Sequence, residues 1–345
     1  MTIDSLFTTA VEKKASDIHL VAGLKPIVRI DGVLHPLDQK GMSSSLIKEL
    51  VFKMLTAEQK ERLLKNKDID LSYQVTDNGR FRVNIYFEKG NLGLVARIIP
   101  DKIKTMKELN LPEVVYDLLS REQGFILVTG PTGCGKSTTL AAMIEEINTH
   151  FKKNIITLED PIEFLFKPNK SIIVQRELGF DIPSFASGLR HIVRQDPDII
   201  MVGEMRDLET VAAAISLAET GHLVLATLHT YSAAQTIDRI IDIFPPYQQD
   251  QIRSQLSAVL TMVISQRLLP KENGGRVAAR EMLINTPAVG NLIRENKIAQ
   301  VDHVIETSAK EGMITMDKSL KNLYKDGLIA KELIDIYATD IEIKP

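Results

Sequence analysis

The chain has 345 residues, which suggests about two domains with enough sequence to bury a core in each. Its formal net charge of −3 gives no general attraction to nucleic acid or to an anionic membrane, although it does not exclude local basic patches. The only cysteine, Cys134, excludes a disulfide framework and a cysteine metal site, so we expect a reducing, cytoplasmic setting.

Residues 1–100 are predicted to form a small α+β domain. A short helix begins the chain, strand patterns lie at 18–21, 26–30 and 69–75, and one polar helix is expected at 44–65. The N-terminal segment lacks the apolar core of a signal peptide, and no apolar run approaches the roughly 18 residues of a membrane span. We therefore expect any membrane association to be peripheral or to depend on a partner.

A β-hairpin is predicted at the end of this domain, from strand patterns at 80–87 and 92–98 joined by a short turn. With the turn centred between these strands, Arg82 lies directly opposite Arg97 on the polar face. Directly opposed arginines repel each other unless an anion lies between them, and the phosphate of a nucleotide on a neighbouring subunit is one candidate. The alternative is that both side chains splay apart into solvent.

The second half of the chain is predicted to form an α/β core. Residues 101–111 are polar and are interpreted as a linker, and strand-length apolar runs alternate with helical patterns in residues 112–345. This alternation predicts a mostly parallel sheet with crossover helices, as in a RecA-like core. Apolar residues at 248–269 recur at helical spacing and predict a helix that ends near Pro270, before a strand at 277–284 and several short C-terminal helices.

One segment of this core, GPTGCGKS, matches the phosphate-binding pattern G-x-x-x-x-G-K-[ST] at every fixed position. It lies between a strand pattern at 125–128 and a helical pattern at 138–147, so backbone N–H groups and the helix dipole are expected to bind a phosphate. Lys136 is expected to contact the β- and γ-phosphates, and Ser137 to bind Mg²⁺. The predicted nucleotide-binding residues are Gly130, Pro131, Thr132, Gly133, Cys134, Gly135, Lys136, Ser137 and Thr138. The sequence therefore predicts a P-loop NTPase.

Acidic residues follow a strand pattern in NIITLEDPIE, where Glu159 and Asp160 end the strand and Glu163 follows within one turn. In an open α/β sheet the ligand lies at the carboxyl ends of the strands, so these carboxylates are candidates for binding Mg²⁺ or for orienting the attacking water. The alternative is a strand end with exposed acids that have no role in catalysis.

A second strand pattern, DIIMVGE, ends on Glu204 in the manner of a Walker B strand. Glu204 is the leading candidate for the general base or for a carboxylate beside the metal. Gly203 occupies the position at which a Walker B strand usually carries aspartate. Its presence leaves open which carboxylate organises Mg²⁺ and gives more weight to Asp160 and Glu163.

A third strand pattern, GHLVLATLHT, is bracketed by His222 and His229. His229 emerges at the same sheet edge as the two acidic segments and is a candidate contact to the γ-phosphate. His222 lies at the opposite end of the strand, where a hydrogen bond within the core is the simpler role.

The segments GPTGCGKST, ITLEDPIE, DIIMVGEMRD and GHLVLATLHT, in this order, resemble the Walker A, Asp box, Walker B and His box of the type II/IV secretion ATPases. SDIHL and KPIVRIDG resemble the start of the PAS-like domain of that family, so the resemblance covers nearly the whole chain. The C-terminal domain has no cysteine for the metal-binding insertion of the assembly and type II secretion relatives, and NLIRE resembles a motif of the pilus-retraction branch. Val289 and Gly290 depart from that motif.

The resemblance implies a cytoplasmic homohexamer that uses ATP and Mg²⁺ to power pilus retraction and twitching motility at the cytoplasmic face of the inner membrane. Its expected partners are an inner-membrane platform protein and, indirectly, the pilin fibre, with no direct contact to nucleic acid. Pilus assembly, type II secretion and, from another class, a nucleic-acid translocating ATPase or a non-catalytic nucleotide-switched ring are the alternatives.

The resemblance also implies roles for individual side chains in the hydrolysis of ATP. Glu204 and Glu163 would position and activate water, and His229 would sense the γ-phosphate. Arg82 and Arg97 would contact the phosphates of a neighbouring subunit. The predicted metal-side residues are Ser137, Glu159 and Asp160.

Overall fold

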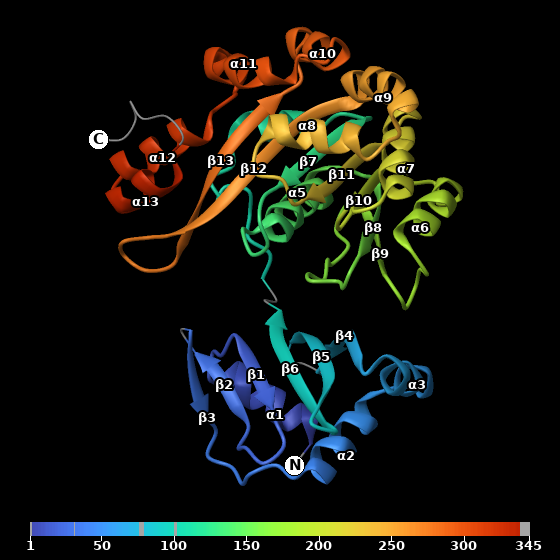
Figure 1. Ribbon diagram of the computed structural model, residues 1–345, viewed down its shortest axis with the longest axis vertical. Coiled ribbons are helices and arrows are strands. Elements are labelled where there is room, and N and C mark those ends of the chain that lie inside the picture. Colours follow the sequence, from blue (N-terminus) through green and yellow to red (C-terminus); the bar gives the residue numbers. More distant parts are fainter. Residues whose placement is uncertain (1, 31, 76–78, 100–101, 339–345) are drawn as a thin grey trace. The chain divides into compact units, whose positions relative to one another are not determined.

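The computed structural model describes residues 2–30, 32–75, 79–99 and 102–338. It divides into two compact units, which we call unit 1 (Met1–Lys102 with Pro161–Leu165) and unit 2 (Ile103–Asp160 with Phe166–Pro345) (Figure 1). Residues 103–111, part of the predicted linker, therefore group with unit 2, whereas residues 100 and 101 lie outside the described residues. The predicted domain limits stay a prediction.

Unit 1 is built on a six-stranded sheet in the order β3-β2-β1-β6-β5-β4, in which all neighbouring strands are antiparallel. Phe7 of the first helix stacks on Phe81 of the sheet, with ring centroids 4.3 Å apart, and both side chains are fully buried. The elements of unit 1 are α1 (Ile3–Glu12), β1 (Asp17–Leu20), β2 (Ile27–Ile30), β3 (Val33–Pro36), α2 (Ser44–Met54), α3 (Ala57–Asn66), β4 (Asp68–Gln74), β5 (Arg80–Glu88) and β6 (Asn91–Ile99).

The single polar helix predicted at 44–65 is wrong, because the structure has two helices there, α2 and α3. Thr56 begins the second helix, since its hydroxyl accepts a hydrogen bond from the Gln59 N–H (3.2 Å) and the Gln59 side chain accepts one from the Thr56 N–H (2.8 Å). This capping box provides acceptors for backbone N–H groups at the start of a new helix, which in a continuous helix would bond to the preceding turn. Strand β3 was also not predicted, because all of its residues are exposed and show no apolar alternation.

The hairpin of β5 and β6 is confirmed, and so is its register, because Arg82 is paired directly with Arg97. Its turn consists of Lys89 and Gly90, which both have positive φ (49° and 79°). Such a two-residue turn matches the twist of the flanking strands and therefore fixes which side chains oppose each other.

Unit 2 contains a seven-stranded sheet in the order β13-β12-β7-β11-β10-β8-β9, parallel throughout except for the antiparallel edge strand β13. Strands β7, β10 and β11 are buried at every residue, as central strands covered on both faces require. The strands are β7 (Gly124–Thr129), β8 (Asn154–Glu159), β9 (Ile172–Glu177), β10 (Ile199–Val202), β11 (Leu223–Leu228), β12 (Leu260–Pro270) and β13 (Arg276–Ile284). The predicted α/β sheet is confirmed.

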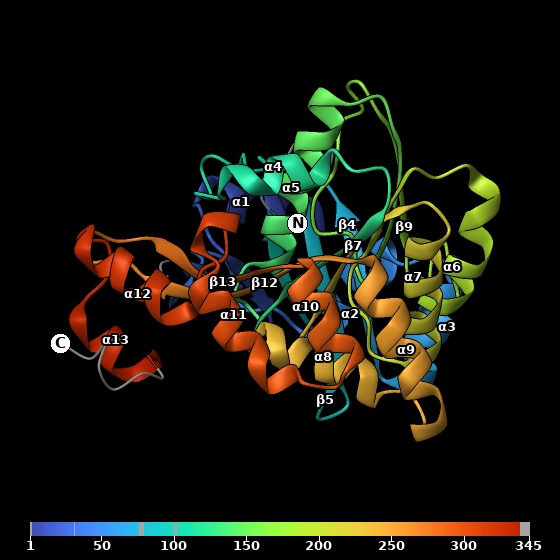
Figure 2. The same cartoon turned by 90° about the horizontal axis from the view of Figure 1, so that it is seen from above.

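The helices of unit 2 cover both faces of this sheet. Figure 2 shows α5 on one face and α8 and α9 on the other, as right-handed crossovers between parallel strands require. The helices are α4 (Glu113–Leu119), α5 (Lys136–His150), α6 (Phe185–Ile192), α7 (Leu208–Glu219), α8 (Ala233–Asp242), α9 (Pro246–Val259), α10 (Pro287–Arg294), α11 (Val301–Thr307), α12 (Met316–Lys325) and α13 (Lys331–Tyr337). None of the helices in the described part of the chain combines the length and the apolar character needed to cross a membrane.

The helix predicted through residues 248–269 is wrong in its second half, because α9 ends at Val259 and β12 begins at Leu260. Strand β12 pairs with β7 on one side and with β13 on the other. A strand buried on both faces carries a continuous apolar run, which periodicity alone does not distinguish from a buried helix.

Helix α10 contains the two residues that depart from the retraction-branch motif. Val289 is fully buried, and a Cβ added at Gly290 would lie 3.4 Å from the backbone oxygen of Ser257 in α9. Glycine at position 290 therefore allows α10 to pack closely on α9.

Candidate nucleotide-binding site

The predicted phosphate loop lies between β7 and α5, so the expected order of strand, loop and helix is confirmed. Gly130, Gly133 and Gly135 all have positive φ, of 141°, 81° and 92°. A Cβ added at Gly130 would lie only 2.3 Å from the backbone oxygen of Gln266 and 2.6 Å from the Cys134 sulfur. The glycines of this pattern are therefore required by the turn of the backbone and by the close approach of β12.

The N-terminus of α5 differs from those of the next three helices. Helices α6, α7 and α8 each begin with a side chain that accepts a hydrogen bond from a backbone N–H of the first turn, and these side chains are those of Ser184, Asp207 and Ser232. Helix α5 has Gly135 at this position, no side-chain cap and no acidic residue in its first turn. No cap side chain therefore occupies this end of α5, and the helix dipole favours an anion there.

Lys136 is buried at the start of α5, with its ammonium turned toward the loop. Its Nζ donates to the backbone oxygens of Gly130 (2.8 Å) and Pro131 (3.2 Å) and lies 3.4 Å from Nδ1 of His229. A phosphate oxygen would bind the ammonium more strongly than a carbonyl does, because the hydrogen bond would then join opposite charges.

His229, which follows β11, bridges Lys136 and Glu204. Its Nδ1 faces the Lys136 ammonium, and its Nε2 lies 3.4 Å from Oε2 of Glu204. Because an ammonium can only donate, Nδ1 must accept, and the proton of a neutral imidazole is then on Nε2 and points to the carboxylate. The structure therefore brings three predicted site residues into one hydrogen-bonded series.

Glu204 has a second partner that the sequence did not indicate. Nη2 of Arg206 lies 2.8 Å from its Oε1, and the arginine side chain is largely exposed whereas that of Glu204 is mostly buried. Arg206 belongs to the segment DIIMVGEMRD, and the only feature of the sequence that could have indicated this contact is its position two residues after Glu204. Both carboxylate oxygens of Glu204 are therefore held by cationic or polar side chains.

Gly203 has a structural reason to replace the expected aspartate. A Cβ at this position would lie 3.2 Å from the backbone oxygen of Leu158 and 3.4 Å from Cα of Glu159, at the end of the neighbouring strand β8. A side chain at position 203 would require the end of this strand to shift by a few tenths of an ångström. Glu159, the last residue of β8, and Asp160, which follows it, stay the candidate metal-side acids.

Glu159 is buried, and its Oε1 accepts hydrogen bonds from the Thr157 hydroxyl (2.6 Å) and the Gln175 amide (3.0 Å). Asp160, the next residue, is exposed. No cluster of three or more histidine, cysteine or acidic residues suited to a metal occurs within the described ranges. A nucleotide-held Mg²⁺ does not need one, because phosphate and water oxygens supply most of its ligands. The donor set of Ser137 with Glu159 or Asp160 is thus chemically suited to Mg²⁺, and its role stays a prediction.

Asp17 lies between two arginines on the polar face of unit 1. Its Oδ1 accepts from Nε of Arg97 (2.9 Å), and its Oδ2 lies 4.0 Å from Nε of Arg29. Burial by itself raises the pKa of Asp17, but hydrogen bonds from Ser16 and Arg97 outweigh it and hold the pKa below its ordinary value. Arg97 therefore has an internal counter-ion.

Arg82, the arginine opposite Arg97, also lies near an acid of unit 1. Its Nη1 is 3.8 Å from Oε1 of Glu163, which belongs to the segment Pro161–Leu165. The repulsion that suggested an external anion is thus relieved within unit 1, by Asp17 and Glu163. A contact of Arg82 and Arg97 with a neighbouring subunit, and the role of Glu163 in activating water, stay predictions.

The structure also shows the surroundings of His222 and Cys134, two further residues considered in the sequence. Nδ1 of His222 lies 2.9 Å from the backbone oxygen of Leu217 and ties the end of α7 to the start of β11. The thiol of Cys134 is buried, and burial raises its pKa. A raised pKa and low exposure make this thiol a poor nucleophile for modifying reagents.

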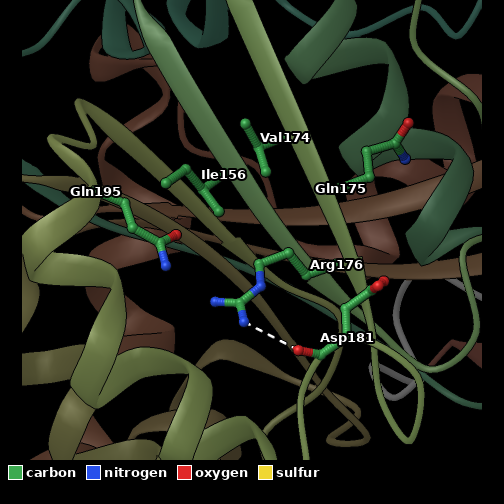
Figure 3. Close-up of a pocket in the computed structure, with 6 residues that line it drawn as sticks. All are labelled: Ile156, Val174, Gln175, Arg176, Asp181 and Gln195. Atoms are coloured by element: carbon green, nitrogen blue, oxygen red, sulfur yellow. Dashed lines mark hydrogen bonds between the residues drawn. The ribbon is translucent and has the colours of Figure 1, made fainter.

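Pockets among the described residues of unit 2 include one beside β9 and one beside the phosphate loop. The larger, of about 570 Å³, lies beside β9, and Figure 3 shows Arg176 donating across it to the backbone oxygen of Asp181 (3.0 Å). The smaller, of about 120 Å³, borders the phosphate loop and is lined by Pro131, Thr132, Gly133, Cys134, Arg267, Leu268, Leu269 and Tyr337. The series of Lys136, His229 and Glu204 is part of neither lining.

Similar proteins include the type IV pilus retraction ATPase PilT of Pseudomonas aeruginosa, 46% identical over 332 residues, which cover 96% of this chain and 96% of that protein. A twitching motility protein of Neisseria gonorrhoeae is 45% identical over 332 residues, covering 96% and 89% of the two chains. The crystal structure of the pilus retraction motor PilT with bound ADP has a TM-score of 0.93 at 47% identity, covering 99% of this chain and 98% of that one. The Legionella pneumophila ATPase DotB has a TM-score of 0.86 at 28% identity, covering 97% and 95%.

These similarities extend over both units, so the predicted fold class, a RecA-like core with a smaller N-terminal domain, is confirmed. A family model described as type II/IV secretion system protein matches residues 1–303. The chain belongs to the type II/IV secretion system protein family.

Proposed function

We propose that this protein is a motor ATPase that hydrolyses ATP, with Mg²⁺, to power the retraction of type IV pili and hence twitching motility. The observation that carries the proposal is the uncapped N-terminus of α5, with Lys136, His229 and Glu204 joined in series beside it. The similarity to PilT of Pseudomonas aeruginosa over nearly the whole chain supports retraction as the process that is driven.

The reaction is phosphoryl transfer to water, in which the protein mainly positions groups and stabilises charge. The loop amides and Lys136 bind the phosphates, and His229, beside Lys136, senses the γ-phosphate. Glu204, with Glu163, orients the attacking water and accepts its proton. When bound, Mg²⁺ would be held by Ser137 and, through water, by Glu159 or Asp160, and it would neutralise charge on the phosphate oxygens.

The proposed working form is a homohexamer at the cytoplasmic face of the inner membrane. In this ring, Arg82 and Arg97 of one subunit reach the phosphates bound by the next. The inner-membrane platform protein receives the motion and passes it to the pilin fibre. Nucleic acid is not a direct partner, and DNA is therefore expected to leave the rate of ATP hydrolysis unchanged.

The site is tested by steady-state ATP hydrolysis in the Lys136→Ala and Glu204→Gln variants. We expect both rates to fall at least about a hundredfold, because one variant loses phosphate binding and the other loses the proton acceptor. Binding of ADP should be lost in Lys136→Ala and kept in Glu204→Gln. Hydrolysis at the wild-type rate in either variant would overturn the site assignment.

The direction of the motor is tested by deleting the gene in the source organism. Retraction predicts cells that carry an excess of surface pili and do not twitch. Cells without pili would instead make the protein an assembly motor. Normal pili and normal twitching would contradict both readings.

A further inference from the structure

Gln266 lies on β12, directly behind the phosphate loop, and its side chain is buried. Its Nε2 donates to the backbone oxygen of Cys134 (2.9 Å), and its Oε1 accepts from the hydroxyl of Thr139 (3.0 Å). One amide therefore joins the middle of the loop to the first turn of α5.

The chemistry of the two partners fixes the orientation of this amide. A backbone oxygen can only accept, so the NH₂ group must face Cys134, and the carbonyl group must then face Thr139. A carboxylate at position 266 would place an acceptor against an acceptor. Glutamine suits this position because its amide supplies both a donor and an acceptor, and because its side chain is long enough to reach both partners.

The hydrogen bond to Cys134 also orients the next N–H group of the loop. In a trans peptide the C=O and the following N–H point in opposite directions. Because the Cys134 oxygen points to Gln266 on β12, the Gly135 N–H points away from β12. This is the direction that a phosphate-binding loop requires, with the carbonyl turned outward and the amide left for the anion.

The backbone and the neighbouring side chain of β12 hold the other end of the loop. The Gln266 backbone oxygen approaches Gly130 so closely that no Cβ would fit there. The Ser265 hydroxyl accepts a hydrogen bond from Thr129, the last residue of β7 (2.9 Å). Strand β12 therefore holds the loop where it leaves β7 and where it enters α5.

We propose that Gln266 is a positioning residue that keeps the phosphate loop in its nucleotide-binding shape, an inference that rests on the proposed ATPase function. Holding the Cys134–Gly135 peptide and Thr139 in place reduces the ordering that nucleotide binding would otherwise require. Gln266 does not contact the reacting atoms. Its effect is therefore on affinity for the phosphates more than on the chemical step.

The test compares Gln266→Met with wild type by calorimetric binding of ADP and by ATP turnover. Methionine has a similar length and no hydrogen-bonding amide, so the Cys134 oxygen and the Thr139 hydroxyl lose their partner. We expect the affinity for ADP to fall about tenfold and the KM for ATP to rise by about the same factor. The change in kcat should be smaller. The loss of affinity for ADP should be greater in Gln266→Glu, because a carboxylate oxygen would then face the Cys134 backbone oxygen.

Asn285→Leu is the matched control for lost stability. The Asn285 amide donates to the backbone oxygens of Ser257 (2.9 Å) and Leu260 (2.8 Å). Leu260 is the first residue of β12, at the opposite end of the strand from the residues that contact the loop. This variant should lower the melting temperature and leave the affinity for ADP unchanged. An unchanged ADP affinity in Gln266→Met, with only a lower melting temperature, would overturn the inference.

A second pair of variants tests the same contact from α5. Thr139→Val removes the hydroxyl at nearly constant size and should weaken ADP binding, whereas Thr139→Ser keeps it and should bind as wild type does. Equal binding by both would contradict the inference even if Gln266→Met does not fold. Failure of the proposed function is distinguishable, because wild-type protein would then bind no ADP.

Discussion

At the scale of single residues, Glu204 is held on both oxygens, by Arg206 on one and by His229 on the other. A carboxylate that accepts a proton from water needs a free lone pair directed at that water. Arg206 occupies one lone pair of one carboxylate oxygen, so a second lone pair of that oxygen stays open to water. The pair therefore orients Glu204 without closing it to water.

Replacing Arg206 with alanine tests this orientation. We expect kcat to fall about tenfold, because Glu204 is then fixed on one oxygen only, and the binding of ADP to stay unchanged. Arg206→Lys, which keeps the charge, should recover part of the loss. A fall in ADP affinity without a change in kcat would place Arg206 in nucleotide binding instead.

Asp17 makes the stability of unit 1 depend on pH. Its pKa is held below the ordinary value, so its stabilising effect is complete above about pH 3.9, the usual pKa of aspartate, and is lost as the pH falls through the lower folded value. At neutral pH the Asp17→Asn variant should be less stable than wild type by about 1–3 kcal/mol. Urea unfolding at several pH values should show this difference shrinking in acid, and a constant difference would contradict the assignment.

At the scale of elements, the close pairing of β8 and β10 determines which side chains the site contains. Gly203 lies against the backbone of Leu158 and Glu159, so a side chain at position 203 would crowd the end of β8. The acids of the site are instead distributed, with Glu204 after β10 and with Glu159 and Asp160 at the end of β8.

Introducing side chains at position 203 tests this pairing. Gly203→Ala should destabilise the protein by about 1–3 kcal/mol through overpacking, and Gly203→Asp by more, since it also brings a charge. Differential scanning calorimetry measures the loss, and hydrolysis of ATP should fall with it. A stable and fully active Gly203→Asp variant would show that β8 can accommodate an acid there.

How far the sequence predicts these elements depends on the contacts that define them. The β5–β6 hairpin is predictable because apolar alternation and turn length are local, and together they place Arg82 opposite Arg97. Strand β12 is not predictable from its own residues, because its strand character comes from pairing with β7 and β13. The role of Gln266 was missed for the same reason, since a helix over 248–269 would not place it against the phosphate loop.

In the candidate site, too, residues marked by local patterns were predicted, and contacts between distant residues were not. Lys136, Glu204 and His229 were predicted together, because each follows a strand of a parallel sheet whose carboxyl ends share an edge. The pairings of Asp17 with Arg97 and of Glu163 with Arg82 join residues far apart in the sequence, and no local pattern indicates them.

At the scale of the whole molecule, the proposed ring predicts that Arg82 and Lys136 act in different subunits on the same nucleotide. Arg82→Ala and Lys136→Ala chains should each be inactive alone. When mixed before assembly, they should recover part of the wild-type hydrolysis, because some interfaces then combine an intact loop with an intact arginine. Activity measured against the mixing ratio checks this, and a complete lack of recovery would argue that Arg82 acts within its own subunit.

The path of the chain between the units has a mechanical consequence. The chain passes from unit 1 to unit 2 after Lys102, returns after Asp160 and leaves again after Leu165. The second of these crossings directly follows Glu159 and Asp160, the candidate metal-side acids, and precedes Glu163. A rotation of one unit against the other would therefore pull on the peptide that carries these carboxylates. In the proposed ring, a force that rotates one unit against the other would thus change the geometry of these acids through covalent bonds.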